Sequence, residues 1–96
     1  MDNINEICKQ AIEHFGEMPQ KAKAAEKLSE LVAELMRDVN DDHADRESVI
    51  DRIADCNIML RQLTIMYGEG NVLMRTYEKA SRLANRIKEE LAVQLE

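Results

Sequence analysis

Apolar residues recur every three or four positions along most of the chain, the spacing that places them on one side of an α-helix. The first such segment follows Asn3, whose spacing to Glu6 indicates a capping box, and Gly16 is its predicted stop. The second opens near Pro19, which a first helical turn tolerates, and runs to about Val39. The N-terminal part of the chain is therefore predicted to form two helices.

The rest of the chain keeps the same periodicity. Residues 46–67 have a wide apolar arc, so this segment is predicted to be the most buried helix, with Asp45 as its N-cap. Residues 68–70 break the pattern, and Asn71 can cap a fourth helix that runs almost to the end of the chain. No segment alternates with the period of two expected for a strand. The predicted fold class is all-α, with one helical domain over residues 1–96.

The composition agrees with a helical bundle. The chain is 45% hydrophobic and 33% charged, with one Pro and three Gly. A chain of this length buries only about 60–65% of its unfolded surface. We therefore expect a homo-oligomer, a dimer or a tetramer, that shares its core. Methionines at helical spacing are predicted to fill that core: Met59, Met66 and Met74.

Charge and cysteine usage restrict the possible partners. A net charge of −6 and an aromatic content of 3% argue against binding to nucleic acid or to an anionic membrane surface. No apolar run has the length of a membrane span, and the N-terminus lacks a signal-peptide pattern. Cys8 and Cys56 have no C-x-x-C spacing, which is typical of reduced thiols that pack in a core. We expect a cytoplasmic protein.

Carboxylates form a ladder on the second predicted helix. Glu26, Glu30 and Glu34 recur every fourth residue, and Asp51 and Asp55 have the same spacing on the third helix. Two such pairs on facing helices would present the oxygen ligands that Mg²⁺ prefers. In a chain that is one-third charged, the same spacing also describes an ordinary solvated face, so both interpretations stand.

Two motifs in order along the chain resemble a known family. "EKLSEL" and, after a polar loop, "DRIADCNIMLRQL" are similar to the E-E-x-x-E and E-x-x-D signature of the MazG-like all-α nucleoside triphosphate pyrophosphohydrolases. "PQKAKAAEKL" and "YEKASRLANRI" extend the resemblance to small phage or bacterial members over most of the chain. It implies a four-helix bundle, completed by oligomerisation, that uses Mg²⁺ to hydrolyse a nucleoside triphosphate to the monophosphate and pyrophosphate.

The match to that signature is incomplete. Glu26, Glu30 and Asp55 fall on motif acids, but Lys27 and Arg52 stand where the family has metal-binding glutamates. At about 4 Å and an effective dielectric of 20, each unit-charge contact is worth roughly 4 kcal/mol, so two charge reversals disfavour a metal at this site. If the helices face each other as in the family, Lys27 approaches Asp55 and Arg52 approaches Glu30, in place of the divalent ion.

Further candidate ligands follow from the same resemblance. Lys79, Arg82 and Arg86 share one face of the last helix, and the family places basic residues of its terminal helix near the triphosphate. The alternative is that these cations are solvated or paired with neighbouring glutamates. Asn57 is predicted to face inward beside Asp55, where it could contact a base or sugar.

Three functions remain open. The favoured one is a catalytically impaired, nucleotide-binding MazG-like protein without a cofactor. It would sequester a nucleotide or nucleotide second messenger, as a phage counter-defence protein would. The second is an active Mg²⁺-dependent pyrophosphohydrolase with Glu26, Glu30 and Asp55 as catalytic acids and a shifted metal site that adds Asp51. The third is a structural helical dimer that binds another protein.

Overall fold

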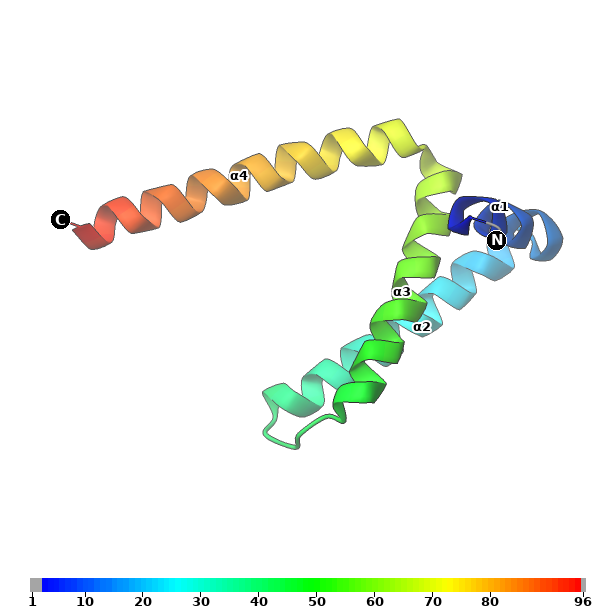
Figure 1. Cartoon of the computed structure of the whole chain (residues 1–96), viewed down its shortest axis with the longest axis horizontal. Coiled ribbons are helices and arrows are strands. Elements are labelled where there is room, and N and C mark those ends of the chain that lie inside the picture. Colours follow the sequence, from blue (N-terminus) through cyan, green and yellow to red (C-terminus); the bar gives the residue numbers. More distant parts are fainter. Residues whose placement is uncertain (1–2, 96) are drawn as a thin grey trace. The chain divides into compact units, whose positions relative to one another are not determined.

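The computed structural model describes residues 3–95, and almost all of them lie in helices. Its helices are α1 (Ile4–Phe15), α2 (Glu17–Val39), α3 (Arg46–Tyr67) and α4 (Glu69–Leu95) (Figure 1). Residues 3–95 contain no strand, so the predicted all-α class with four helices is confirmed. None of the helices in this range combines the length and the apolar character needed to cross a membrane.

Local capping explains where the first helices begin and end. The Asn3 side chain accepts a hydrogen bond from the backbone N–H of Glu6 at 2.8 Å, as the sequence predicts. Gly16 has a φ of 97°, which a residue with a Cβ rarely adopts, and it ends α1 directly before α2. Asp45 accepts from the backbone N–H of Ser48 at 3.2 Å and so caps α3.

The turn after α2 is a Schellman motif. The backbone N–H of Asp42 donates to the carbonyl of Arg37 at 2.8 Å, and that of Asp41 donates to the carbonyl of Asp38 at 3.1 Å. Asp41 has a φ of 63°, a left-handed conformation that Asp tolerates better than most residues. The Asp38 side chain also accepts from the backbone N–H of Ala44 at 2.8 Å. These bonds reverse the chain between α2 and α3.

The described chain divides into two compact units, residues 3–66 and residues 67–95. In the first unit, α2 and α3 lie side by side and antiparallel (Figure 1). Gln20 pairs with Gln62 at one end of their contact and Glu30 pairs with Arg52 further along. The second unit is α4 together with Tyr67 and Gly68. The prediction of one domain over residues 1–96 stays a prediction.

The core of the first unit is small and partly polar. Its buried apolar residues are Cys8, Ala24, Cys56 and Met59. Three buried residues lie on α3, more than on any other helix, as predicted. Both cysteines are free and buried, as predicted; burial raises the pKa of the Cys8 thiol, and the charge of Arg61 opposes that rise.

Two predictions about the fourth helix are wrong. Gly68 has a φ of 103°, which separates α3 from α4, and α4 begins at Glu69. Asn71 therefore lies inside the first turn of α4 and does not cap the helix. Met74 is exposed and does not fill a core, whereas Met59 is buried and Met66 is half-buried. Met59 belongs to α3, which has three buried residues, whereas α4 has none.

Candidate functional site

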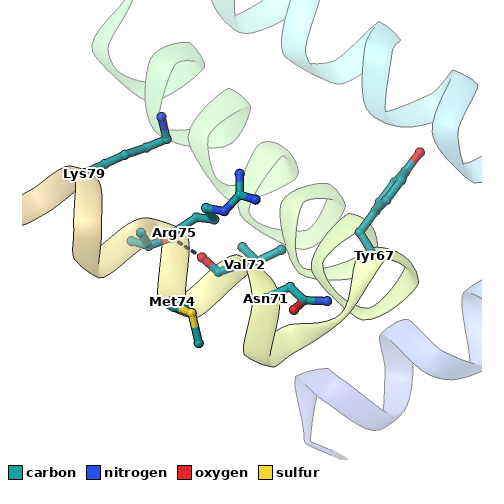
Figure 2. A pocket seen from close by; sticks show the side chains of 7 residues that line it. Tyr67, Asn71, Val72, Met74, Arg75 and Lys79 are labelled. Carbon is teal, nitrogen blue, oxygen red and sulfur yellow. Dashed lines mark hydrogen bonds between the residues drawn. The ribbon is translucent and has the colours of Figure 1, made fainter.

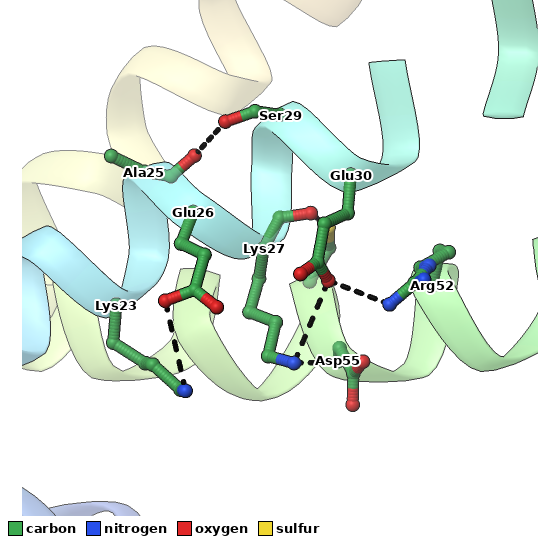
Figure 3. A network of polar contacts seen from close by, with 9 residues as sticks. Lys23, Ala25, Glu26, Lys27, Ser29, Glu30, Arg52 and Asp55 are labelled. Carbon is green, nitrogen blue, oxygen red and sulfur yellow. Dashed lines mark hydrogen bonds and ion pairs between the residues drawn. The ribbon is translucent and has the colours of Figure 1, made fainter. Parts of the chain in front are cut away.

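The α2–α3 seam, defined here as the contact between Gln20–Glu34 of α2 and Arg52–Gln62 of α3, brings both charged motifs together. Antiparallel pairing sets Lys27 opposite Asp55 and Glu30 opposite Arg52 (Figure 3). The seam is held in place beneath these side chains by Cys56, whose thiol donates to the carbonyl of Lys27 at 3.4 Å. The motifs of α2 and α3 therefore contact each other in this register.

Lys27 and Arg52 converge on one carboxylate oxygen. Arg52 Nη1 donates to Glu30 Oε2 at 2.6 Å, and Lys27 Nζ lies 3.5 Å from the same oxygen. Lys27 Nζ also lies 3.7 Å from Asp55 Oδ2. Figure 3 shows the three side chains meeting around the Glu30 carboxylate. The predicted approaches of Lys27 to Asp55 and of Arg52 to Glu30 are both confirmed.

This cluster is electrically balanced and only partly shielded from water. Two cations face two carboxylates, so its formal charge is zero. The side chains of Lys27, Glu30 and Arg52 are between 23% and 35% exposed, so solvent screens the ion pairs without separating them. Arg52 has five N–H donors and hydrogen bonds to Glu30 through one of its nitrogens. The cations therefore retain donor capacity for a further anion.

The remaining acids of the ladder are held by separate partners. Glu26 pairs with Lys23 at 3.7 Å, and Glu34 lies 3.9 Å from Arg37. Glu34 Oε2 is buried without a hydrogen-bond partner among the described residues. Each of these pairs lies on α2 alone, so neither contributes to the contact across the seam.

The acids of the ladder do not form a group of metal ligands among the described residues. Within residues 3–95, no three Asp, Glu, His or Cys side chains are grouped so that they could hold a metal ion. The shifted set of Glu26, Glu30, Asp51 and Asp55 is therefore not gathered into one ligand cluster. Asp51 instead lines a shallow hollow of about 380 Å³ on α3, together with Ser48, Arg52, Ala54 and Asp55. Arg52 is the only cationic residue among those that line this hollow.

The basic residues of α4 form a row on the second unit. Lys79, Arg82 and Arg86 are all exposed, and Arg86 Nε lies 3.9 Å from Glu90 Oε1. Lys79 and Arg75 line a hollow of about 790 Å³ along the first turns of α4 (Figure 2). Sequence reasoning missed Arg75, although its spacing of four residues to Lys79 places it in the same row.

Asn57 does not face inward as predicted. It is exposed, because it follows Cys56, which occupies the buried side of α3, and each helical step turns the side chain by about 100°. Asp55, two residues earlier, lies on the side that Lys27 reaches. Asn57 therefore does not belong to the cluster around Glu30.

Comparison of the chain with protein-family models, with curated proteins and with solved structures gives no match. The resemblance to MazG-like enzymes therefore rests on the sequence motifs alone.

Proposed function

We propose that this chain is a MazG-like helical protein that binds the phosphates of a nucleotide through Lys27 and Arg52 without a metal ion and without hydrolysing it. The observation that carries the proposal is the convergence of Arg52 Nη1 and Lys27 Nζ on one carboxylate oxygen, at 2.6 Å and 3.5 Å. A phosphate oxygen can take the place of Glu30 Oε2 between these two cations.

A phosphate has a chemical advantage over Glu30 at this position. It carries more negative charge than one carboxylate, and the planar guanidinium of Arg52 can bind two of its oxygens at once. The ammonium group of Lys27 adds a second positive charge beside the Arg52 guanidinium. Because the cluster lies at the surface, Glu30 can rotate into solvent when the phosphate takes its place. Binding is then an exchange of anions, and its affinity reflects the competition with Glu30.

Two features support a binding protein over the hydrolytic alternative. Lys27 and Arg52 occupy the positions that the resemblance assigns to metal-binding glutamates, and both point toward the acids a metal would need. The described residues also provide no cluster of three ligands for a divalent ion.

Calorimetric titration with a panel of nucleotides, in chelator and in Mg²⁺, tests the proposal. We expect at least one nucleotide to bind in chelator, and we expect Arg52→Gln and Lys27→Gln each to weaken it at least about tenfold, as the loss of a charge-assisted hydrogen bond predicts. Lys9→Gln removes the same charge from an exposed position on α1 and serves as the control. The absence of any binding in chelator would overturn the proposal.

The Glu30→Gln variant separates a phosphate site from a purely structural ion cluster. If the anions compete, removing the Glu30 charge strengthens nucleotide binding, whereas a structural cluster gives no change in affinity. Pyrophosphate release from the same nucleotides with Mg²⁺, above that of boiled protein, would instead favour the active pyrophosphohydrolase.

A further inference from the structure

Helix α4 exposes large apolar side chains that nothing in its own unit covers. Its 27 residues include no buried side chain, and Leu73, Tyr77, Ile87 and Leu91 are each at least half exposed. A helix of this kind gains most of its stability in water by packing its apolar face against a partner. We define the α4 apolar stripe as Leu73, Tyr77, Ala80, Ala84, Ile87 and Leu91.

The stripe is narrow and continuous. At about 100° per residue, its six members fall within an arc of about 80°. The cations of α4 lie almost opposite, with the centre of their row about 150° away around the helix axis. That row consists of Arg75, Lys79, Arg82 and Arg86. A partner can therefore cover the stripe without burying a cation.

The stripe reads the same in both directions. Its spacings are four, three, four, three and four residues, and its side chains run large, large, small, small, large, large. When two copies of α4 are laid antiparallel, Leu73 faces Leu91 of the second copy and Tyr77 faces Ile87 of the second copy. Ala80 then faces Ala84 of the second copy, so the two backbones approach most closely at the centre. This self-complementarity is what a twofold interface requires.

Charge also favours a second copy at this helix. Residues 67–96 carry five basic and five acidic side chains, so two such segments meet without net repulsion. Residues 1–66 carry eight basic and fourteen acidic side chains, and two copies of that unit repel each other. Beside the antiparallel stripe, Lys88 lies opposite Met74 of the second copy and Glu90 lies opposite Thr76 of the second copy. No like charges are opposed.

We propose that the α4 apolar stripe is the docking surface for the same stripe of a second copy, in an antiparallel twofold pair. The pair leaves the basic row of α4 facing solvent, where it remains open to an anion. The proposal goes beyond nucleotide binding and does not depend on it, because none of the stripe residues lies in the α2–α3 seam.

The mass of the full-length chain in solution tests the pairing. Sedimentation equilibrium is expected to give an assembly built from dimers of the 11.0 kDa chain. Ala80→Glu with Ala84→Glu is expected to raise the dissociation constant at least about a hundredfold, because carboxylates would face one another in the dry centre. Ala92→Glu makes the same change about 100° away from the stripe and should leave the mass unchanged. A monomeric parent chain, or an unaltered mass of the double variant, overturns the proposal.

Disulfide trapping tests the orientation. Chains with Leu73→Cys and chains with Leu91→Cys, carrying different tags, are mixed and oxidised. The antiparallel pair predicts disulfides only between the two kinds of chain, since residues 73 and 91 are about 27 Å apart along one helix. Disulfides within each kind would show a parallel pair and overturn the arrangement. The native thiols of Cys8 and Cys56 are buried and do not compete.

Discussion

The α2–α3 seam and helix α4 use the same kinds of side chain with opposite results. In the seam, Arg52 makes a 2.6 Å ion pair with Glu30 across two helices, and neighbouring Met59 is only 5% exposed. On α4, Arg86 lies 3.9 Å from Glu90 of the same helix, and Met74 is 64% exposed. Charge and hydrophobicity alone do not distinguish these residues. Within the seam, α2 and α3 face each other, and this contact gives Arg52 a partner on a second helix.

Truncating a methionine in each region gives the largest contrast. Met59→Ala should lower the free energy of unfolding by about 2–4 kcal/mol, because it leaves a cavity between packed helices. Met74→Ala should change it by less than about 0.5 kcal/mol, because Met74 is exposed and lies outside the α4 apolar stripe. Urea unfolding followed by circular dichroism, at one protein concentration, measures both. Equal losses would remove the distinction between the regions.

The buried glutamine pair provides the next contrast. Gln20 Nε2 donates to Gln62 Oε1 at 2.8 Å inside the seam. Gln20→Ala leaves the Gln62 carbonyl buried without this donor and should cost about 1–3 kcal/mol. Gln94→Ala on exposed α4 should be nearly neutral. In the same unfolding assay, replacing both Gln20 and Gln62 by Leu should recover much of the loss. A double Leu variant that loses as much unfolding free energy as the two single Leu variants added together would contradict this pairing.

The arginines should differ by a smaller amount. Arg52→Met should lower the free energy of unfolding by about 1 kcal/mol, since it removes a charge-assisted bond from a partly exposed pair. Arg86→Met should cost less than about 0.5 kcal/mol, because its pair with Glu90 is exposed and lies on one helix. The Arg52 effect should persist at 1 M salt better than the Arg86 effect, since screening is weaker for partly buried charges. Identical salt dependence would contradict the difference.

The smallest expected effect is the pH dependence of the Cys8 thiol. Burial raises its pKa in the folded chain above the ordinary value of 9.0. The folded state therefore holds its proton more tightly than the unfolded state, and this contribution to stability is complete below that value. It is lost as the pH rises through the raised pKa. Unfolding curves at increasing alkaline pH should show this loss in the parent chain and not in Cys8→Ala. A parallel decline in both would assign the effect to other groups.

The predictability of the fold depended on local signals. Asn3, Gly16 and Asp45 act through hydrogen bonds or backbone angles within a few residues, so their roles could be identified from the sequence. The end of α2 at Val39 and the end of α4 near Leu95 could also be predicted, from the helical spacing of apolar residues. Asn71 was misplaced because a capping residue and a first-turn residue differ only in backbone conformation, which Gly68 had already decided.

The candidate site was predictable in part for a different reason. Lys27, Glu30, Arg52 and Asp55 came together as expected because two antiparallel helices with matched motifs leave little freedom of register. The prediction for Asn57 was wrong, since the direction of its side chain depends on which side of α3 is buried. Arg75 was overlooked because the family motif covers only the later part of the basic row.

The sequence by itself determined the four helices, the acid ladder and the cations inserted into it, because each depends on spacing along a single helix. Only the tertiary structure decided which of these side chains meet. Glu30 shares one oxygen between Lys27 and Arg52, whereas Glu26 and Glu34 turn to partners on their own helix. The physical reason is that an ion pair across helices needs a register and an interhelical distance. Packing of Cys56, Met59 and the Gln20–Gln62 pair sets both.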